Sequence, residues 1–132
     1  MAAAPFVGNT YGGVTSQGQP VVVDMKPTRR QIVRAVVALE LTCTSGTGFV
    51  VPDRYTRVPV TRSGKFRVAF GPITQRNDDG TTTDVEGRIS GALNRARTAI
   101  SGSWSLSATE HDTTGAVTDT CSSGSVRWKA KQ

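Results

Sequence analysis

The sequence predicts an all-β fold, a single antiparallel β-sandwich or closed β-barrel of about seven to nine strands. Three observations support this prediction. The 132 residues suffice for one domain of ordinary size. Val and Thr number 34, against 11 for Leu, Glu and Lys together, which favours strands over helices. Runs in which apolar and polar residues alternate recur along the chain and are separated by turn-forming residues.

The composition also limits the class of protein. Hydrophobic residues make up 36% of the sequence, a share typical of a folded domain once glycine is counted with them. The longest apolar run, residues 35–39, is too short for a membrane span, and helix formers are too few for a bundle or a coiled coil. We therefore expect a folded domain without a membrane span.

The first part of the chain lacks the alternation. Residues 1–18 contain five Gly or Pro residues and show little periodicity, so we predict an irregular, partly ordered N-terminal arm. We assign residues 19–132 to a single all-β domain, because no linker, repeat or low-complexity segment divides them.

The first long strand is predicted over residues 31–44. Its odd positions form one apolar face, which comprises Val33, Ala35, Val37, Leu39, Leu41 and Cys43. A helix that begins near Pro27, with Thr28 as its N-cap, is the competing interpretation. Because the valines are poor helix formers and the alternation continues to the end of the run, we favour a turn at residues 26–30 followed by a strand.

Two shorter strands are predicted at residues 65–70 and 83–90. The side chains expected to face the core are Phe66, Val68, Phe70, Val85, Gly87 and Ile89. Those expected to face solvent are Lys65, Arg67, Asp84, Glu86 and Arg88.

The longest alternation covers residues 95–108, and a last strand is predicted over residues 126–131. The inward positions of these two strands are Ala96, Thr98, Ile100, Gly102, Trp104, Leu106, Ala108, Val126, Trp128 and Ala130. Period-2 geometry therefore places both tryptophans in the core. The alternative is that Trp104 or Trp128 lies outside and stacks against a sugar ring or a base.

Turns that contain glycine separate the strands. They are predicted at residues 44–48, 62–64, 77–80, 113–115 and 122–124. Short strands at such regular spacing are typical of antiparallel sandwiches and barrels alike.

The two cysteines occur in matching contexts, Cys43-Thr-Ser-Gly and Cys121-Ser-Ser-Gly. Each ends a predicted strand just before a turn, so the two can lie side by side, and we predict a disulfide between them. A disulfide in a small chain rich in Gly, Ser and Thr indicates a secreted protein, whereas two free thiols in a cytoplasmic protein are the alternative. Two cysteines and one histidine do not form a four-ligand zinc site, so we expect no metal and no cofactor.

The N-terminal sequence agrees with an extracellular location. No signal peptide is visible, because Met1 is not followed by a basic region and an apolar core. The start resembles an initiating methionine placed before the N-terminus of a mature secreted protein.

The chain is basic, with a net charge of +6 and a pI near 10.0. This balance suits an anionic partner such as an extracellular polymer or an acidic glycan. The candidate contacts are Arg95, Arg97, Arg127 and Lys129. Because the basic residues are dispersed along the sequence, we expect no arginine-lined groove and only weak, salt-sensitive affinity for polyanions. Nucleic acid is not the expected partner.

One histidine limits the catalytic interpretations. His111 lies between Glu110 and Asp112 and could act as a general base. Sequence neighbours on a strand point to opposite faces, however, so neither acid is well placed to orient the ring. We expect an exposed histidine beside a turn.

The acidic residues offer two further interpretations. Residues 77–80 together with Asp84 could bind Ca²⁺, but they lack the spacing of a calcium loop, and a hairpin turn is the simpler prediction. A glycosidase would need Glu40 and Glu86 to face each other. Both are strand residues that point outward in the predicted pattern.

Three segments carry a resemblance to a known group. Residues 11–17, 101–105 and 121–128 resemble the Tyr-x-Gly-x-Thr-Ser-Gln start and the Cys-x-Ser-Gly…Trp ending of uncharacterised small secreted β-proteins of high-GC actinobacteria. The resemblance implies secretion and carries no activity. Gly102-Ser-Trp104 is also similar to the Gly-x-Trp motif of lipocalin- and avidin-like barrels, in which it lies near the first strand rather than late in the chain.

These observations favour a secreted, non-enzymatic binding or surface-interaction module for an anionic polymer or glycan. A small secreted hydrolase and a structural or self-assembling surface protein are the alternatives. The sequence leaves the oligomeric state open.

Overall fold

Nine antiparallel strands form one sheet in this computed structural model, which describes residues 9–132. No helix occurs within those residues, which confirms the all-β prediction. The strands are β1 (Thr10–Thr15), β2 (Pro20–Met25), β3 (Gln31–Cys43), β4 (Gly48–Pro59), β5 (Lys65–Arg76), β6 (Thr82–Leu93), β7 (Ala99–His111), β8 (Val117–Ser122) and β9 (Val126–Lys131).

Six of the strands close into a barrel, in the order β3–β2–β1–β9–β7–β8 and back to β3. The other three extend the sheet beyond this ring. β4 lies beside β3, whereas β6 and then β5 lie beside β7. Of the two predicted architectures, the closed barrel therefore forms, with a free-edged strand at each end of the sheet.

The ring closes at a short joint between β3 and β8. This joint consists of two residue pairs, Thr42 with Ser122 and Cys43 with Cys121. The sulfur atoms of the second pair are bonded to each other and link positions 78 residues apart. The predicted disulfide is therefore confirmed, and it lies at the joint that closes the barrel.

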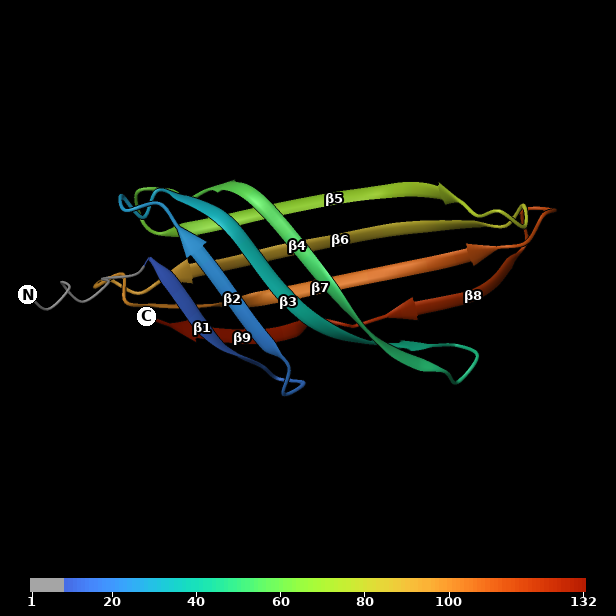
Figure 1. Ribbon diagram of the computed structural model, residues 1–132, viewed down its shortest axis with the longest axis horizontal. Helices are drawn as coiled ribbons and strands as arrows, with labels where there is room; N and C mark the ends of the chain where they lie inside the picture. The colour runs from blue at the N-terminus through green and yellow to red at the C-terminus, as the bar shows by residue number, and fades with distance from the viewer. Residues whose placement is uncertain (1–8) are drawn as a thin grey trace, which may run out of the picture.

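The core lies between two layers that cross at a steep angle. Strands β1–β4 pass over β5–β7 (Figure 1), and the buried apolar side chains of both layers meet between them. Neighbouring aromatic rings in this core have centroids 5.6–6.3 Å apart, within the range of favourable ring contacts. The rings run in the order Phe66, Trp128, Trp104, Tyr55 and Phe70.

Most of the predicted inward faces are confirmed. Residues 26–30 form a turn, and the competing helix does not form. Val68, Phe70 and Val85 are partly buried and pack against the core. The predicted inward side chains that are buried include Phe66, Ile89, Ile100, Trp104, Leu106, Val126, Trp128 and Ala130.

The prediction of an irregular arm over residues 1–18 is wrong for its second half, and residues 1–8 lie outside the described part. Thr10–Thr15 forms β1, which pairs with β2 on one side and with β9 on the other. Tyr11 and Thr15 are buried, but two glycines between them conceal the alternation. Gly13 is needed because a Cβ atom there would lie 1.8 Å from the carbonyl oxygen of Lys129.

The substitution Gly13→Ala is expected to lower the free energy of unfolding by about 2 kcal/mol, because the methyl group would force β9 away from β1. Gly12→Ala is the matched control, since nothing lies within 4 Å of the corresponding position. A change within about 0.5 kcal/mol is expected for the control. Urea denaturation measures both variants, and equal stabilities would contradict the close approach of the two strands.

The burial pattern of β3 changes phase at Val33, which was predicted to face inward. Val33 is 46% exposed, whereas its neighbour Ile32 is fully buried. On β2, Met25 pairs with Ile32 and Asp24 pairs with Arg34, so Val33 is the extra residue of a β-bulge. The alternation of residue types cannot indicate such a bulge, because the bulge leaves the sequence pattern unchanged and alters only the side of the sheet to which each side chain points.

Residues 95–98 form a turn rather than the first residues of a strand, which corrects the predicted start of β7. The Asn94 side-chain oxygen accepts hydrogen bonds from the backbone N–H groups of Thr98 and Ala99, at 2.8 and 3.1 Å. Arg97 has a φ of 58°, in the left-handed region. Asn94 favours this turn because its short amide side chain replaces backbone partners.

Candidate functional site

Outward side chains of four neighbouring strands form one polar face of the sheet. The register aligns them in rows that cross β5, β6, β7 and β9. One row joins Arg67, Ser90, Ser103 and Arg127. The next row joins Lys65, Ala92, Ser101 and Lys129. Because neighbouring strands lie about 4.8 Å apart, the basic residues of β5 and those of β9 form two lines about 14 Å apart at the backbone.

Ser105 and Arg88, which pair across β7 and β6, continue the same face, and Ser107 follows along β7. We call this surface the serine–arginine face. It comprises Lys65, Arg67, Arg88, Ser90, Ser101, Ser103, Ser105, Ser107, Arg127 and Lys129.

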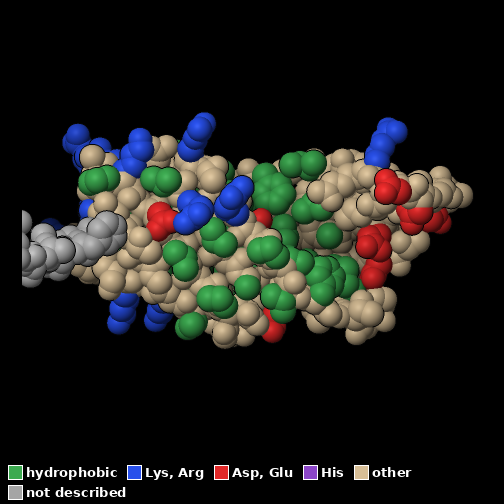
Figure 2. Space-filling model, in the orientation of Figure 1, with side chains coloured by type: hydrophobic (Ala, Val, Ile, Leu, Met, Phe, Trp, Pro, Cys, Tyr) green, Lys and Arg blue, Asp and Glu red, His purple; other side chains and the backbone are tan. Residues whose placement is uncertain are grey.

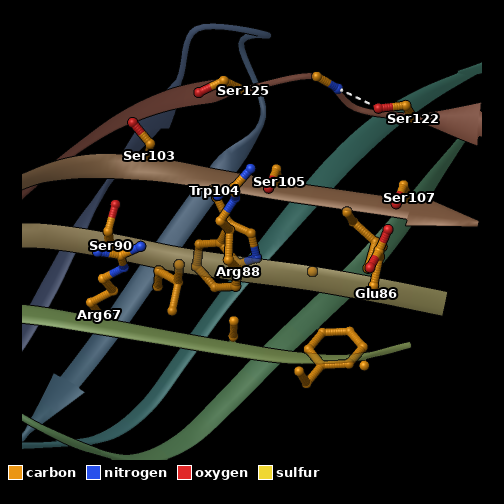
Figure 3. Close-up of a pocket in the computed structure, with 17 residues that line it drawn as sticks. Arg67, Glu86, Arg88, Ser90, Ser103, Trp104, Ser105, Ser107, Ser122 and Ser125 are labelled. Atoms are coloured by element: carbon orange, nitrogen blue, oxygen red, sulfur yellow. Dashed lines mark hydrogen bonds between the residues drawn. The ribbon is translucent and has the colours of Figure 1, made fainter. Parts of the chain in front are cut away.

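Part of the serine–arginine face, from Arg67, Ser90 and Ser103 to Ser107, is hollow, with a volume of about 870 Å³. Figure 3 shows three serines along β7, with Arg88 and Glu86 on the neighbouring strand and Arg67 on the strand beyond. The connection between β8 and β9 adds Ser122 and Ser125 to the rim. Serine is a small residue, so a row of serines leaves a depression between the longer side chains beside it.

The polar groups of this face have no partners within residues 9–132. The hydroxyls of Ser90, Ser103 and Ser105 make no hydrogen bond there, and neither do the guanidinium groups of Arg67 and Arg88. The ion pairs in the described part lie elsewhere. Serine both donates and accepts hydrogen bonds, and arginine offers five donors. The face therefore presents unengaged hydroxyls between unpaired positive charges.

Negative charge gathers at one end of the molecule instead. Figure 2 shows most Asp and Glu side chains gathered toward the end that carries the β5–β6 and β7–β8 turns, and most Lys and Arg side chains toward the opposite end of the visible face. Six of the ten acidic residues lie in those turns or the adjoining strand ends, namely Asp78, Asp79, Asp84, Glu110, Asp112 and Asp119. This asymmetry directs an anionic ligand away from the turns.

Two of the four predicted basic contacts belong to this face, and two do not. Arg127 and Lys129 lie on its β9 border. Arg95 lies in the turn before β7, away from the face. Arg97 in the same turn has a structural role, because its guanidinium donates hydrogen bonds to the carbonyl oxygens of Arg29 and Arg62.

Of the basic residues on this face, Arg67 and Arg88 line the hollow, beside Glu86. Sequence reasoning placed Lys65, Arg67 and Arg88 on outward faces but missed that they share a face with Arg127 and Lys129. The residues of β5 and β9 lie about sixty positions apart in the chain, and only the strand order β9–β7–β6–β5 brings them together. A single sequence carries no signal for that order.

Both tryptophans are core residues. Trp104 is fully buried and Trp128 is 2% exposed, so neither indole is available to stack against a surface ligand. The indole N–H of Trp104 donates a hydrogen bond to Asp53 over 2.7 Å. Burial raises the pKa of Asp53, and this hydrogen bond opposes the increase. Burial also raises the pKa of Tyr55, with a smaller contribution from the nearby Asp53 charge.

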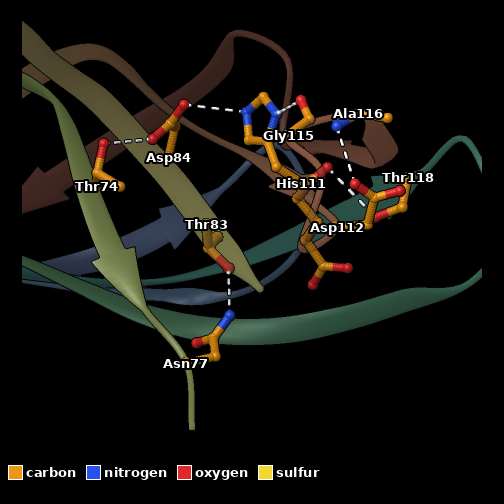
Figure 4. Close-up of polar contacts among 10 residues, drawn as sticks. Thr74, Asn77, Thr83, Asp84, His111, Asp112, Gly115, Ala116 and Thr118 are labelled. Atoms are coloured by element: carbon orange, nitrogen blue, oxygen red, sulfur yellow. Dashed lines mark hydrogen bonds and ion pairs between the residues drawn. The ribbon is translucent and has the colours of Figure 1, made fainter. Parts of the chain in front are cut away.

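His111 lies at the end of β7 and contacts an acid from another strand. Its two ring nitrogens lie 3.1 Å from Asp84 and 3.1 Å from the carbonyl oxygen of Gly115 (Figure 4). The adjacent acids Glu110 and Asp112 do not orient the ring, as predicted. The Thr74 hydroxyl above all, and His111 in addition, lower the pKa of Asp84. This partly buried cluster connects three strands beside the turns.

Residues 77–80 form the predicted hairpin turn. The Asp79 carboxylate accepts hydrogen bonds from the backbone N–H and the hydroxyl of Thr81. The Asp84 carboxylate instead contacts Thr74 and His111. The two carboxylates therefore do not point at a common calcium site. Within residues 9–132, the side chains that gather closely enough to hold a metal ion are Cys43, Asp119 and Cys121. Two of these three are joined in the disulfide.

Glu40 and Glu86 do not form a facing pair. Glu40 lies on the outer face of β3, where Gln19 donates a hydrogen bond to its carboxylate over 3.1 Å. Glu86 borders the serine–arginine face on β6, in the other layer of the barrel. The two-carboxylate arrangement that glycoside hydrolysis requires is therefore not formed by these residues.

No protein-family model matches the chain, and no curated protein is significantly similar to it. The part of the chain from residue 9 onward contains no helix of the length and hydropathy needed to cross a membrane.

Proposed function

We propose that this protein is a secreted, non-enzymatic binding module whose serine–arginine face holds an extracellular anionic polymer or glycan. The observation that carries the proposal is the cross-strand row of Arg67, Ser90, Ser103 and Arg127. It places a positive charge at each side of a strip of hydroxyls. A polymer that carries both acidic groups and hydroxyls complements such a surface.

The chemistry of the face supports a polymer rather than a compact ligand. Arg67 and Arg88 line the hollow, and the positive charges of the whole face lie along two lines rather than converging on one point. Exposed charges contribute modestly when taken singly, so an extended ligand that contacts many of them gains the most. The disulfide supports the extracellular part of the proposal, because cytosolic proteins rarely retain one.

The two free edges of the sheet, β4 and β5, give little support to the alternative function, a self-assembling surface protein. Just before β4, the backbone N–H of Cys43 donates to the carbonyl oxygen of Thr47. Hydrogen-bonded and non-hydrogen-bonded pairs alternate along β3 and β4 from this point, so the backbone groups of Pro52 point away from β3, toward the free edge. Proline has no N–H to offer a further strand. On β5 the register shifts between Phe70 and Ile73, around Pro72. Interrupted edges of this kind oppose strand-to-strand assembly.

Dextran sulfate is expected to bind the protein, and neutral dextran is not. The affinity should fall linearly with salt on logarithmic axes and be lost near about 0.5 M salt, where the Debye length is a few ångströms. The double substitution Arg67→Ser and Arg127→Ser should weaken binding about tenfold, since it removes two exposed charge contacts. Isothermal titration calorimetry at several salt concentrations measures these effects.

The matched control is the double substitution Arg30→Ser and Arg54→Ser. It removes the same net charge from exposed residues that lie outside the serine–arginine face. It should weaken binding no more than about twofold, through long-range attraction alone. An equal loss in both double variants, or equal binding of neutral dextran, would disprove the assignment to this face.

A further inference from the structure

A second hollow adjoins the serine–arginine face at the free edge of β5. Its volume is about 530 Å³, and it shares Arg67 and Ser90 with the first hollow. Its lining is different, because side chains from the end of β4, the start of β5 and the end of β6 make it mostly apolar. The apolar contributors are Pro59, Val60, Phe66 and Ala92. We call it the apolar recess.

Backbone hydrogen bonds fix the walls of the recess. The turn between β4 and β5 is held by bonds from Thr61 N–H to the Lys65 carbonyl oxygen and from Gly64 N–H to the Thr61 carbonyl oxygen, at 2.8 and 2.9 Å. Leu93 N–H donates to the Gly64 carbonyl oxygen over 2.9 Å and ties this turn to the end of β6. The recess is therefore formed before any ligand arrives, which lowers the entropic cost of binding.

The small side chain of Ala92 makes the recess possible. Ala92 pairs with Lys65 across β6 and β5 and with Ser101 across β6 and β7. A larger residue at this position would narrow the recess, whose lining also includes Val60 and Phe66. Both of these are almost fully buried, at 6% and 4% exposure, so they present a firm apolar wall rather than mobile side chains.

Two positive charges border this apolar space. Lys65 and Arg67 line the recess on β5, both are exposed, and neither side chain has a hydrogen-bond or ion-pair partner among the described residues. An apolar trough next to unpaired cations complements a ligand with an apolar chain and an anionic head group. A neutral lipid or a cationic amphiphile would leave these charges without a partner.

We propose that the apolar recess binds the alkyl chain of an organic anion of the fatty-acid class, with its carboxylate held by Lys65 and Arg67. A chain suits the recess better than a sugar, because the apolar lining offers few hydrogen-bond partners to hydroxyls. The assignment goes beyond polymer binding: the two sites overlap at Lys65, Arg67 and Ser90, but the alkyl chain is held by the apolar lining rather than by the hydroxyl strip.

Titration with straight-chain carboxylates tests the assignment. The affinity should increase about two- to fourfold for each methylene added between hexanoate and decanoate, as expected when each one leaves water. Decyltrimethylammonium has a chain of the same length and the opposite charge, and it should bind at least about tenfold more weakly. Backbone NMR shifts with decanoate should be largest at residues 59–67 and 90–92. Affinity that does not depend on chain length would overturn the proposal.

Three variants locate the site. Ala92→Phe should narrow the recess and abolish the chain-length dependence. Ala38→Phe, on the outer face of β3, is the control for added bulk and should leave decanoate binding unchanged. Lys65→Gln, an exposed substitution that does not depend on repacking, should weaken decanoate about threefold. Unchanged decanoate binding in Ala92→Phe and Lys65→Gln would place the ligand elsewhere. Loss of dextran sulfate binding alone would affect only the polymer proposal.

Discussion

Trp104→Ala is expected to lower the free energy of unfolding by about 4 kcal/mol, the largest effect of any single substitution considered for this protein. Trp104 is fully buried. Its ring contacts those of Tyr55 and Trp128, with centroids 5.6 and 6.3 Å away. Removal of the indole leaves a cavity at the middle of the aromatic chain and takes the N–H donor from Asp53. A domain of this size has a total stability of about 5–15 kcal/mol.

Urea denaturation followed by the fluorescence of the remaining tryptophan measures this loss. Val22→Ala is a suitable control, because Val22 is 40% exposed on the outer face of β2, and its change should stay within about 0.5 kcal/mol. Trp104→Phe keeps a ring but removes the donor, so the pKa of Asp53 should rise further above its ordinary value. Free quenching of Trp104 by iodide, together with wild-type stability of the alanine variant, would show that the indole lies outside the core.

Loss of the disulfide is expected to lower the free energy of unfolding by a similar amount, about 4 kcal/mol in the chain-entropy model. The bond links positions 78 residues apart, so its removal frees a long loop in the unfolded chain. It also leaves the β3–β8 joint with two residue pairs and no covalent bond. The double substitution Cys43→Ser and Cys121→Ser tests both effects.

Unfolding of the wild-type protein with and without reductant provides the matched comparison. Hydrogen exchange should accelerate most at the ends of β3 and β8 once the bond is absent, because this joint has the fewest pairs in the ring. The unreduced, unfolded protein should resist alkylation at both cysteines. Complete alkylation without reduction would contradict the disulfide.

Much of the fold could be predicted because burial on one face imposes alternation. β9 is the clearest case, since Val126, Trp128 and Ala130 are buried and the residues between them are exposed. The matching contexts of Cys43 and Cys121 likewise indicated that two strand ends meet. These signals are local, so a single sequence contains them.

The failures of the sequence-based predictions have physical reasons. β1 was missed because Gly13 makes room for a neighbouring backbone and contributes no side chain to the pattern. The change of phase at Val33 depends on the partner strand, which the sequence of β3 does not specify. Apolar and polar residues alternate by chance over residues 95–98, but the hydrogen bond from the Thr98 N–H to the Asn94 side chain holds this segment in a turn.

The candidate site was predicted only in part, for a different reason. Arg127 and Lys129 were identified as candidate contacts from their position in the basic C-terminal segment. Arg67 and Arg88 were placed on outward faces without a role, because their shared surface depends on which strands are neighbours. Strand order is set by the packing of the whole barrel, and a single sequence carries little information about it.

The pairing of β1 with β9 has a consequence for the order in which the molecule assembles. Gly12 pairs with Lys131 and Thr15 pairs with Trp128, so strands from nearly opposite ends of the chain are neighbours. The hairpins β3–β4, β5–β6 and β6–β7 join adjacent segments and can form while the chain is still being synthesised. β1 has no partner on its second edge until β9 exists. Contacts of such long sequence separation form slowly, and the waiting edge of β1 is exposed to incorrect partners in the meantime. We therefore expect the addition of β1 to β9 to be the last event of folding, and substitutions in β9 to hasten unfolding more than they slow folding.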